Sequence, residues 1–179
     1  LSENKGLIQA GGGTVLLTAK AADTLTQSVV NHTGIIEAKG ISTQGGRILL
    51  DAEGGMAMAA GILDASSNDA RGGRIVATGD RVLVKSGAHL TATGAAGGGE
   101  VLVGGSWQNS DPTVRQATGT VVETGACLEA NAAIKGDGGT VVAWSEVTNP
   151  ASVTRAYGTF EAKGGPEGGD GGRIETSGH

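Results

Sequence analysis

A short glycine block recurs along the whole chain and restricts the folds available to it. The block reads Gly-Gly-x-Val or Gly-Gly-x-Ile and occurs six times, with starts at residues 12, 45, 72, 98, 138 and 171. The spacing between starts varies from 26 residues (72 to 98) to 40 residues (98 to 138). Variable spacing is expected when a fixed coil carries loops of different length, which is typical of solenoid proteins.

A second block precedes each glycine block and consists of a large apolar residue, a spacer and an alanine. The six copies are Ile8-Gln9-Ala10, Ile36-Glu37-Ala38, Leu63-Asp64-Ala65, Leu90-Thr91-Ala92, Leu128-Glu129-Ala130 and Phe160-Glu161-Ala162. This alternation is typical of a strand that is buried on one face. The interval 73–94 divides into three short strand-like segments, each closed by glycine. We therefore predict an all-β parallel solenoid over residues 1–179, with about three strands per coil and little or no helix.

The composition favours a narrow core. Glycine supplies 34 of the 179 residues, and the aromatic residues are two Trp, one Tyr and one Phe. A core in which identical positions stack coil on coil suits aliphatic side chains of similar size. Five residues of the glycine blocks should lie in register on one inner wall: Val15, Ile48, Ile75, Val101 and Val141. Trp107 and Trp144, which have no equally large counterparts, should lie on loops or outward faces.

Charge and cysteine content exclude several classes of function. The chain has 13 basic and 18 acidic residues, a net charge of −5 and no basic cluster, which disfavours binding to nucleic acid. Cys127 is alone, so an internal disulfide and a cysteine-rich metal site are excluded. No apolar run approaches the roughly 18 residues of a membrane span.

Both ends of the chain begin or stop within a repeat. We therefore expect an excerpt of a longer protein whose open ends are covered by further chain or by another molecule.

Two insertions and one apolar row are the candidate interaction sites. The insertions cover residues 106–119 and 146–157, and insertions in solenoids often carry contacts. Between the inner-wall positions lie five apolar residues that should face outward, which we call the apolar stripe: Leu16, Leu49, Val76, Leu102 and Val142. Contiguous apolar surface marks an interaction site or lies beneath another element. Loops of the same chain could cover the stripe, or neighbouring rods could pack along it.

The remaining polar candidates carry weaker signals. The outward positions of the second block form a largely acidic row: Gln9, Glu37, Asp64, Thr91, Glu129 and Glu161. Carboxylates suit calcium, but two positions are not acidic, so a solvated face is the alternative. We predict no catalytic, cofactor-binding or metal-binding set, because His32, His89 and His179 are far apart in the repeats. Asn31-His32-Thr33 matches a glycosylation sequon.

Six stretches resemble the large exoproteins of the filamentous haemagglutinin family, namely residues 11–22, 34–38, 45–52, 98–107, 136–144 and 157–178. The most suggestive are Gly-Gly-Glu-Val-Leu-Val-Gly-Gly-Ser-Trp (98–107), Gly-Asp-Gly-Gly-Thr-Val-Val-Ala-Trp (136–144) and Gly-Gly-Asp-Gly-Gly-Arg-Ile-Glu-Thr-Ser-Gly (168–178). The resemblance implies a right-handed parallel β-helix and export by two-partner secretion through a dedicated outer-membrane transporter. It also implies a secreted or cell-surface location outside a Gram-negative-type outer membrane, and service as an adhesin or biofilm-matrix rod.

The resemblance points to the shaft of such a protein. The Asn-Pro-rich motifs of the family's amino-terminal secretion domain are not visible, since Asn149-Pro150 stands in another context. Our leading interpretation is a non-enzymatic rod segment that contacts cell-surface glycans, matrix polysaccharide, or other copies of itself by lateral or end-to-end packing. Two alternatives stay open. One is a polysaccharide lyase-like enzyme, which needs acidic metal ligands, a basic catalyst and aromatic sugar platforms. The other is a passive stalk that presents a toxin or effector domain.

Overall fold

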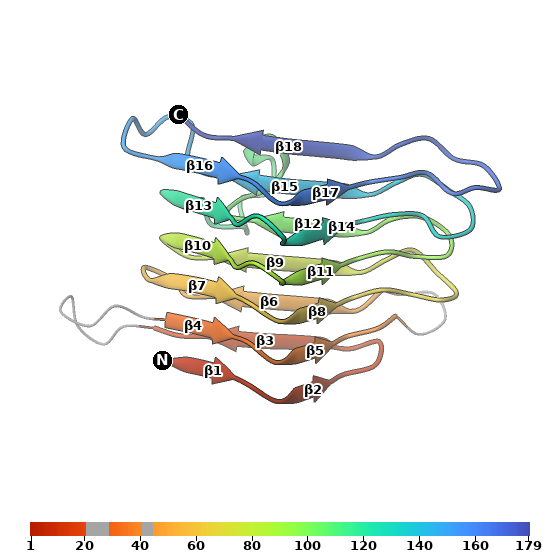
Figure 1. The fold of residues 1–179 in the computed structure, drawn as a ribbon, viewed down its shortest axis with the longest axis horizontal. Coiled ribbons are helices and arrows are strands. Elements are labelled where there is room, and N and C mark those ends of the chain that lie inside the picture. The colour runs from red at the N-terminus through yellow and green to blue at the C-terminus, as the bar shows by residue number, and fades with distance from the viewer. Residues whose placement is uncertain (21–28, 41–44) are drawn as a thin grey trace.

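The chain forms a parallel β-solenoid whose coils stack one above another (Figure 1). The computed structural model describes residues 1–20, 29–40 and 45–179, so residues 21–22, at the end of the first resembling stretch, lie outside the described residues. The described strands form three six-stranded sheets, and each coil adds one strand to each sheet. The predicted all-β solenoid with about three strands per coil is confirmed.

The three sheets follow one another in every coil. Sheet A contains β1 (Ser2–Asn4), β4 (Val29–His32), β7 (Met56–Ala59), β10 (Arg81–Val84), β13 (Gly119–Val122) and β16 (Val153–Ala156). Sheet B contains β2 (Leu7–Gln9), β5 (Ile35–Glu37), β8 (Ile62–Asp64), β11 (His89–Thr91), β14 (Cys127–Glu129) and β17 (Thr159–Glu161). Sheet C contains β3 (Thr14–Thr18), β6 (Arg47–Asp51), β9 (Arg74–Thr78), β12 (Glu100–Val103), β15 (Thr140–Trp144) and β18 (Arg173–Ser177).

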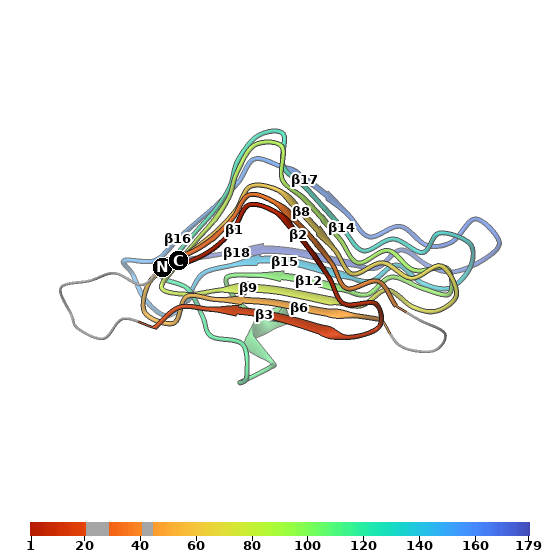
Figure 2. The same ribbon diagram turned by 90° about the horizontal axis from the view of Figure 1, so that it is seen from below.

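Helix is confined to one 3₁₀ turn, η1 (Trp107–Asn109), among the described residues. No helix in this part of the chain combines the length and the hydrophobicity needed to cross a lipid bilayer. Along the solenoid axis the coils superimpose as a triangle, with sheets A and B meeting at the apex and sheet C as the base (Figure 2). A loop after β12 projects outside sheet C in the same view.

The inner wall has the predicted register. Val15 pairs with Ile48, Ile48 with Ile75, Ile75 with Val101, and Val101 with Val141, and all five side chains are buried. The large apolar residues of the second block stack in the same way in sheet B. Each fully buried aliphatic side chain contributes roughly 1.5–3 kcal/mol. The coils are therefore held together mainly by aliphatic ladders, with Trp107 on a loop and Trp144 on the outer face of sheet C, as expected.

The glycine blocks form the corner between sheets B and C. In five coils the second glycine of the block donates its backbone N–H to the carbonyl of the second-block alanine, over 2.7–2.8 Å: Gly13 to Ala10, Gly73 to Ala65, Gly99 to Ala92, Gly139 to Ala130 and Gly172 to Ala162. The corner also packs backbone against backbone between coils. A Cβ added to Gly99 would lie 2.0 Å from the carbonyl oxygen of Gly73 in the preceding coil. The same approach to the preceding coil recurs at Gly73, Gly139 and Gly172, where the added Cβ would lie 2.0–2.1 Å from a carbonyl oxygen.

The two insertions differ in how well the sequence delimits them. Residues 104–118 connect β12 to β13 and contain η1, close to the predicted 106–119; we call this segment the cover loop. The second insertion is shorter than predicted, because Val153–Ala156 form β16 in register with Gly119–Val122. Residues 145–152 form the loop before it. In this strand Thr154 and Ala156 take the inward positions, whereas Val153 is 42% exposed, so the apolar-polar alternation of the other strands is missing.

The end coils are less well buried than the middle ones. Ile8 and Phe160 are only partly buried. Ile174, which continues the inner wall beyond Val141, is 46% exposed. The residues equivalent to them in the middle coils are fully buried. The expectation that further chain or another molecule covers the ends stays a prediction.

A buried polar pair, His32 and Asn4, lies in the apolar interior of the first coils. His32 of β4 is fully buried, and its Nε2 lies 3.0 Å from the carbonyl oxygen of Ile62, which can only accept a hydrogen bond. Nε2 therefore carries the proton, and Nδ1 can accept from the Asn4 side-chain amide at 3.3 Å. Burial lowers the pKa of His32 below its ordinary value of 6.5, although the bond to Ile62 acts in the opposite direction. The interior thus holds a neutral imidazole.

We expect Gly99→Ala to lower the free energy of unfolding by at least about 2 kcal/mol, because the new methyl group must push apart two backbones that have no room to repack. Urea denaturation followed by circular dichroism measures the change. Gly54→Ala is the matched control, since no atom lies within 4 Å of the added Cβ; its effect should stay within about 0.5 kcal/mol. Equal losses in the two variants would contradict a packing role for the corner.

We expect the stability of the chain to fall as the pH drops below about 6.5, because His32 takes up a proton more readily in the unfolded state than in the folded state. Its stabilising contribution is complete above that pH and is lost on acidification. The urea midpoint should therefore decrease from about pH 7.5 to about pH 5, and less steeply in His32→Gln. His179→Gln, which changes an exposed terminal histidine, should keep the slope of the unmodified chain.

Candidate functional site

The apolar stripe lies on the outer face of sheet C in a single row. Leu16 pairs with Leu49, Leu49 with Val76, Val76 with Leu102, and Leu102 with Val142. Accessibility changes along the row: Leu16 is 56% exposed and Leu49 is half-buried, whereas Val76, Leu102 and Val142 are buried. The structure brings all five residues together but leaves only the first two open to solvent.

The cover loop accounts for the buried part of the stripe. Its residues Trp107 and Val114 pack with Val76, Leu102, Val142 and Trp144 in an apolar cluster separate from the solenoid core. Trp144 also donates from its indole Nε1 to the Gln116 side-chain oxygen at 3.0 Å. Of the two alternatives left by the sequence, a loop of the same chain covers Val76, Leu102 and Val142. Leu16 and part of Leu49 stay accessible to another molecule.

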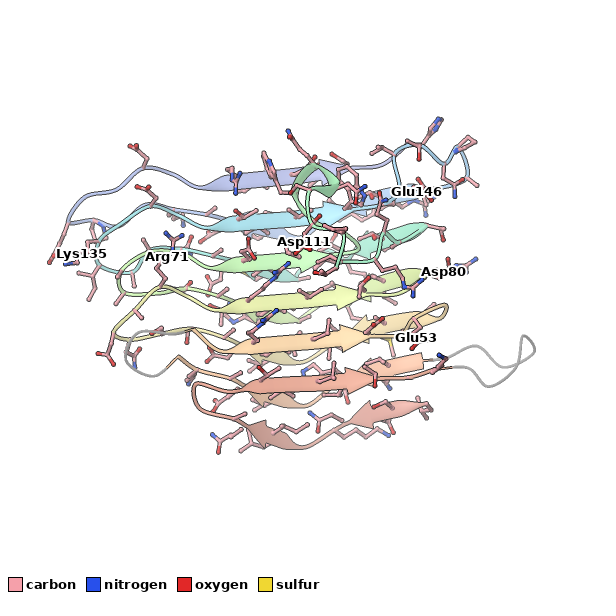
Figure 3. All side chains as sticks on the ribbon, turned by 180° about the vertical axis from the view of Figure 1, so that it is seen from behind. Glu53, Arg71, Asp80, Asp111, Lys135 and Glu146 are labelled. Atoms are coloured by element: carbon pink, nitrogen blue, oxygen red, sulfur yellow. The ribbon has the colours of Figure 1, made fainter. Side chains whose placement is uncertain are left out.

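Polar contacts fix the cover loop to sheet C. Figure 3 shows Asp111 on the loop in front of the strands of this sheet. Asp111 accepts a charged hydrogen bond from the Arg74 guanidinium and two further bonds from Thr113. The Arg74 contact and the bonds from Thr113 lower the pKa of Asp111 to about 2. On the other side of the loop, the Arg173 guanidinium lies 4.7 Å from the centre of the Trp107 ring.

A shallow groove of about 490 Å³ lies beside the cover loop, across the starts of the sheet C strands. Arg47, Arg74 and Arg173 share one outward row of this sheet. Arg71, labelled in Figure 3, comes from the turn before β9. The glycine blocks form the floor of the groove, so a ligand could approach the backbone closely. We call this the arginine groove. Glu100 also lines the groove, and Arg74 is paired with Glu100 at 3.2 Å and with Asp111. The positive charge left for an anionic group therefore comes from Arg47, Arg71 and Arg173.

The arginine groove was not predicted from the sequence. The sequence shows no basic cluster, because these arginines are separated by whole coils. The available signal was the third position of the glycine block, which is arginine in three of the six copies: Arg47, Arg74 and Arg173. These three arginines lie in one row because the glycine blocks of successive coils stack in register.

The acidic row of sheet B is in register, and its carboxylates have partners. The Lys39 ammonium lies 3.2 Å from Asp64 and 3.5 Å from Glu37, and the Lys163 ammonium lies 2.9 Å from Glu161. The hydrogen bond to Asp64 raises the pKa of Lys39, and the bond from Lys163 lowers that of Glu161. These lysines neutralise much of the row, which favours a solvated face over the calcium site.

The candidate catalytic and modification residues are dispersed. His32 points into the core from sheet A, His89 lies on the outer face of sheet B, and His179 is the last residue. Asn31 of the sequon is half-buried and donates to Glu3 at 2.8 Å. Cys127 is half-buried; desolvation, followed by the charge of Glu129, raises the pKa of its thiol. A thiol with a raised pKa is a poor nucleophile at neutral pH.

We expect Asp111→Asn to loosen the cover loop, because it removes the charge that faces Arg74. The contact is partly exposed and screened, so the loss should be about 1 kcal/mol, equal to about fivefold faster trypsin cleavage at Arg115 within the loop. Asp69→Asn, at an exposed turn, should leave cleavage unchanged.

Since the pKa of Asp111 is about 2, its contact with Arg74 should persist at pH 4 and be lost as the pH falls toward 2. Tryptophan fluorescence can follow this change, because Trp107 and Trp144 belong to the apolar cluster under the loop.

Comparisons with known proteins support the exoprotein resemblance. A scan against protein-family models and a search of curated proteins each found no match. Among solved structures, the chain is similar to the HMW1 secretion domain from Haemophilus influenzae, with a TM-score of 0.81 and 28% sequence identity. The match covers 99% of this chain and 44% of that chain, so the chain spans less than half the length of the solved structure.

The match also bears on which part of an exoprotein the chain resembles. The neighbour is itself a secretion domain, so it gives no support to the expectation that the chain is shaft rather than secretion domain. The similarity extends over nearly the whole chain. It agrees with the resemblance to exoproteins that the sequence repeats indicate. The chain is thus a parallel β-solenoid that resembles the β-helical segments of filamentous haemagglutinin-like exoproteins.

Proposed function

We propose that the chain is an exported, non-enzymatic segment of a two-partner secretion exoprotein, which acts as a stiff rod at the cell surface. The observation that carries the proposal is the similarity of 99% of the chain to a secretion domain. The three continuous parallel sheets support the interpretation of the chain as a stiff rod.

A coil that contacts mainly its neighbours can fold progressively as the chain emerges from an outer-membrane transporter. Folding outside the cell would then add coils one at a time.

The outer face of sheet C supports an adhesive role. The open part of the apolar stripe, Leu16 and Leu49, lies beside the arginine groove, since Arg47 and Leu49 belong to the same strand, β6. Apolar contact and guanidinium groups together suit an anionic polysaccharide of a cell surface or matrix. A second copy of the rod could also pack on Leu16 and Leu49. We assign the contacts of the segment to this face.

Export is tested in cells with and without an outer-membrane transporter of the two-partner type. The exoprotein that contains this segment should reach the cell surface or the medium only when the transporter is present. Accumulation outside cells that lack the transporter would contradict the export route.

Adhesion is tested with the chain coupled to beads and presented to host cells and to immobilised anionic polysaccharide. Leu16→Ser/Leu49→Ser and Arg47→Gln should each weaken binding about tenfold, equal to about 1.4 kcal/mol. Leu7→Ser, which changes an exposed leucine on sheet B, is the matched control and should bind normally. Equal loss in all variants, or no binding by the unmodified chain, would contradict the adhesive role. Release of unsaturated uronate products would favour the lyase alternative instead.

A further inference from the structure

Three metal-ligating side chains from two coils meet on the outer face of sheet B. His89 of β11 pairs directly with Cys127 of β14, and Glu129 follows two residues later on the same face of β14. One ligand atom from each residue lies within 4.8 Å of the other two, and the His89 Nε2 is 3.0 Å from the Glu129 Oε1. All three residues are half-buried. Glu129 is also a member of the acidic row, which His89 and Cys127 extend at this point with a nitrogen and a sulfur ligand.

We propose that His89, Cys127 and Glu129 form a binding site for a zinc-like divalent transition metal. An imidazole nitrogen, a thiolate sulfur and a carboxylate oxygen are the ligand types that zinc takes in proteins. In a tetrahedral zinc site such atoms lie roughly 3.3–3.7 Å apart, so the present spacing needs only small side-chain rotations. Nitrogen and sulfur ligands disfavour calcium and magnesium, which select oxygen. Three protein ligands leave the fourth position for water or for a group from a partner.

The surroundings hold the ligands in place. The backbone N–H of His89 donates to the Gly61 carbonyl at 3.0 Å, and that of Cys127 donates to the Ala88 carbonyl at 2.9 Å, so both positions are fixed within the stack of strands. The Asn131 side-chain amide donates to the Glu129 Oε2 at 3.4 Å, which leaves Oε1 directed at His89. Supporting contacts of this kind orient the ligands of metal sites.

A bound metal would join two consecutive coils. β11 and β14 are neighbours in sheet B but are separated in sequence by the cover loop, the longest connection among the described residues. A metal bridge would therefore hold together the two coils that the chain connects least directly. The site is independent of the proposed export and adhesion, so either proposal can fail alone.

The test uses the reduced chain with Zn²⁺ in titration calorimetry and with Co²⁺ as a spectroscopic probe. We expect one equivalent of Zn²⁺ to bind, a thiolate-to-cobalt charge-transfer band with Co²⁺, and a higher unfolding temperature in Zn²⁺. Cys127→Ser should abolish the band, and His89→Gln and Glu129→Gln should each weaken Zn²⁺ binding at least tenfold. Glu37→Gln, in the same acidic row but two coils away, is the control and should bind as the unmodified chain does.

Two results would overturn the site. One is the absence of a thiolate band with Co²⁺ in the unmodified chain. The other is Zn²⁺ affinity that survives in both Cys127→Ser and His89→Gln, which would place the metal elsewhere. Circular dichroism in metal-free buffer shows whether each variant folds. If Cys127→Ser does not fold, the Co²⁺ spectrum of His89→Gln, with a weakened or altered band, decides in its place.

Discussion

The corner hydrogen bond between the second glycine of each glycine block and the alanine carbonyl of the second block is the contact on which the rest of the solenoid depends. It joins sheet B to sheet C within a coil, over 2.7–2.8 Å in the five coils that show it. Four of these glycines, Gly73, Gly99, Gly139 and Gly172, also lie against the backbone of the preceding coil, so a side chain there would separate the layers. One such bond contributes only about 1 kcal/mol. Its importance is geometric, because it sets the turn that brings the inner-wall residues into register.

With the interior fixed in this way, differences between coils are confined to outer faces and connections. The inner wall repeats aliphatic residues, while the outer rows change from coil to coil between leucine, arginine, glutamate, histidine and threonine. The cover loop is the largest such difference, and it converts part of an apolar row into a second small core. A solenoid can vary in this way because outward residues do not disturb the stacking of the next coil.

The sequence predicts the interior well and the surface poorly, for a physical reason. Val15, Ile48, Ile75, Val101 and Val141 could be aligned because burial on one face gives a local alternation and each glycine block marks the register. The arginine groove and the meeting of His89 with Cys127 depend on which residues of different coils lie side by side. The repeat blocks carry this register, since His89 and Cys127 each directly precede a copy of the second block, but neither residue forms a cluster along the chain itself. Val153–Ala156 lies within the predicted insertion 146–157 because its inward residues are Thr154 and Ala156, which do not give the apolar alternation of the other strands. The burial of Val76, Leu102 and Val142 could be stated only as one of two alternatives, since no sequence pattern says where a loop folds back.

The graded cover of the sheet C face gives the rod a direction. A smooth cylinder could accept a lateral neighbour at any height, but here Leu16 is exposed and Leu49 is half-buried, while the loop stands out over β9, β12 and β15. Two such rods packed side by side would not slide freely past one another, because the projecting loop of one would meet the flat coils of the other only at certain offsets. In such a pair the loop would limit the stagger between the two rods.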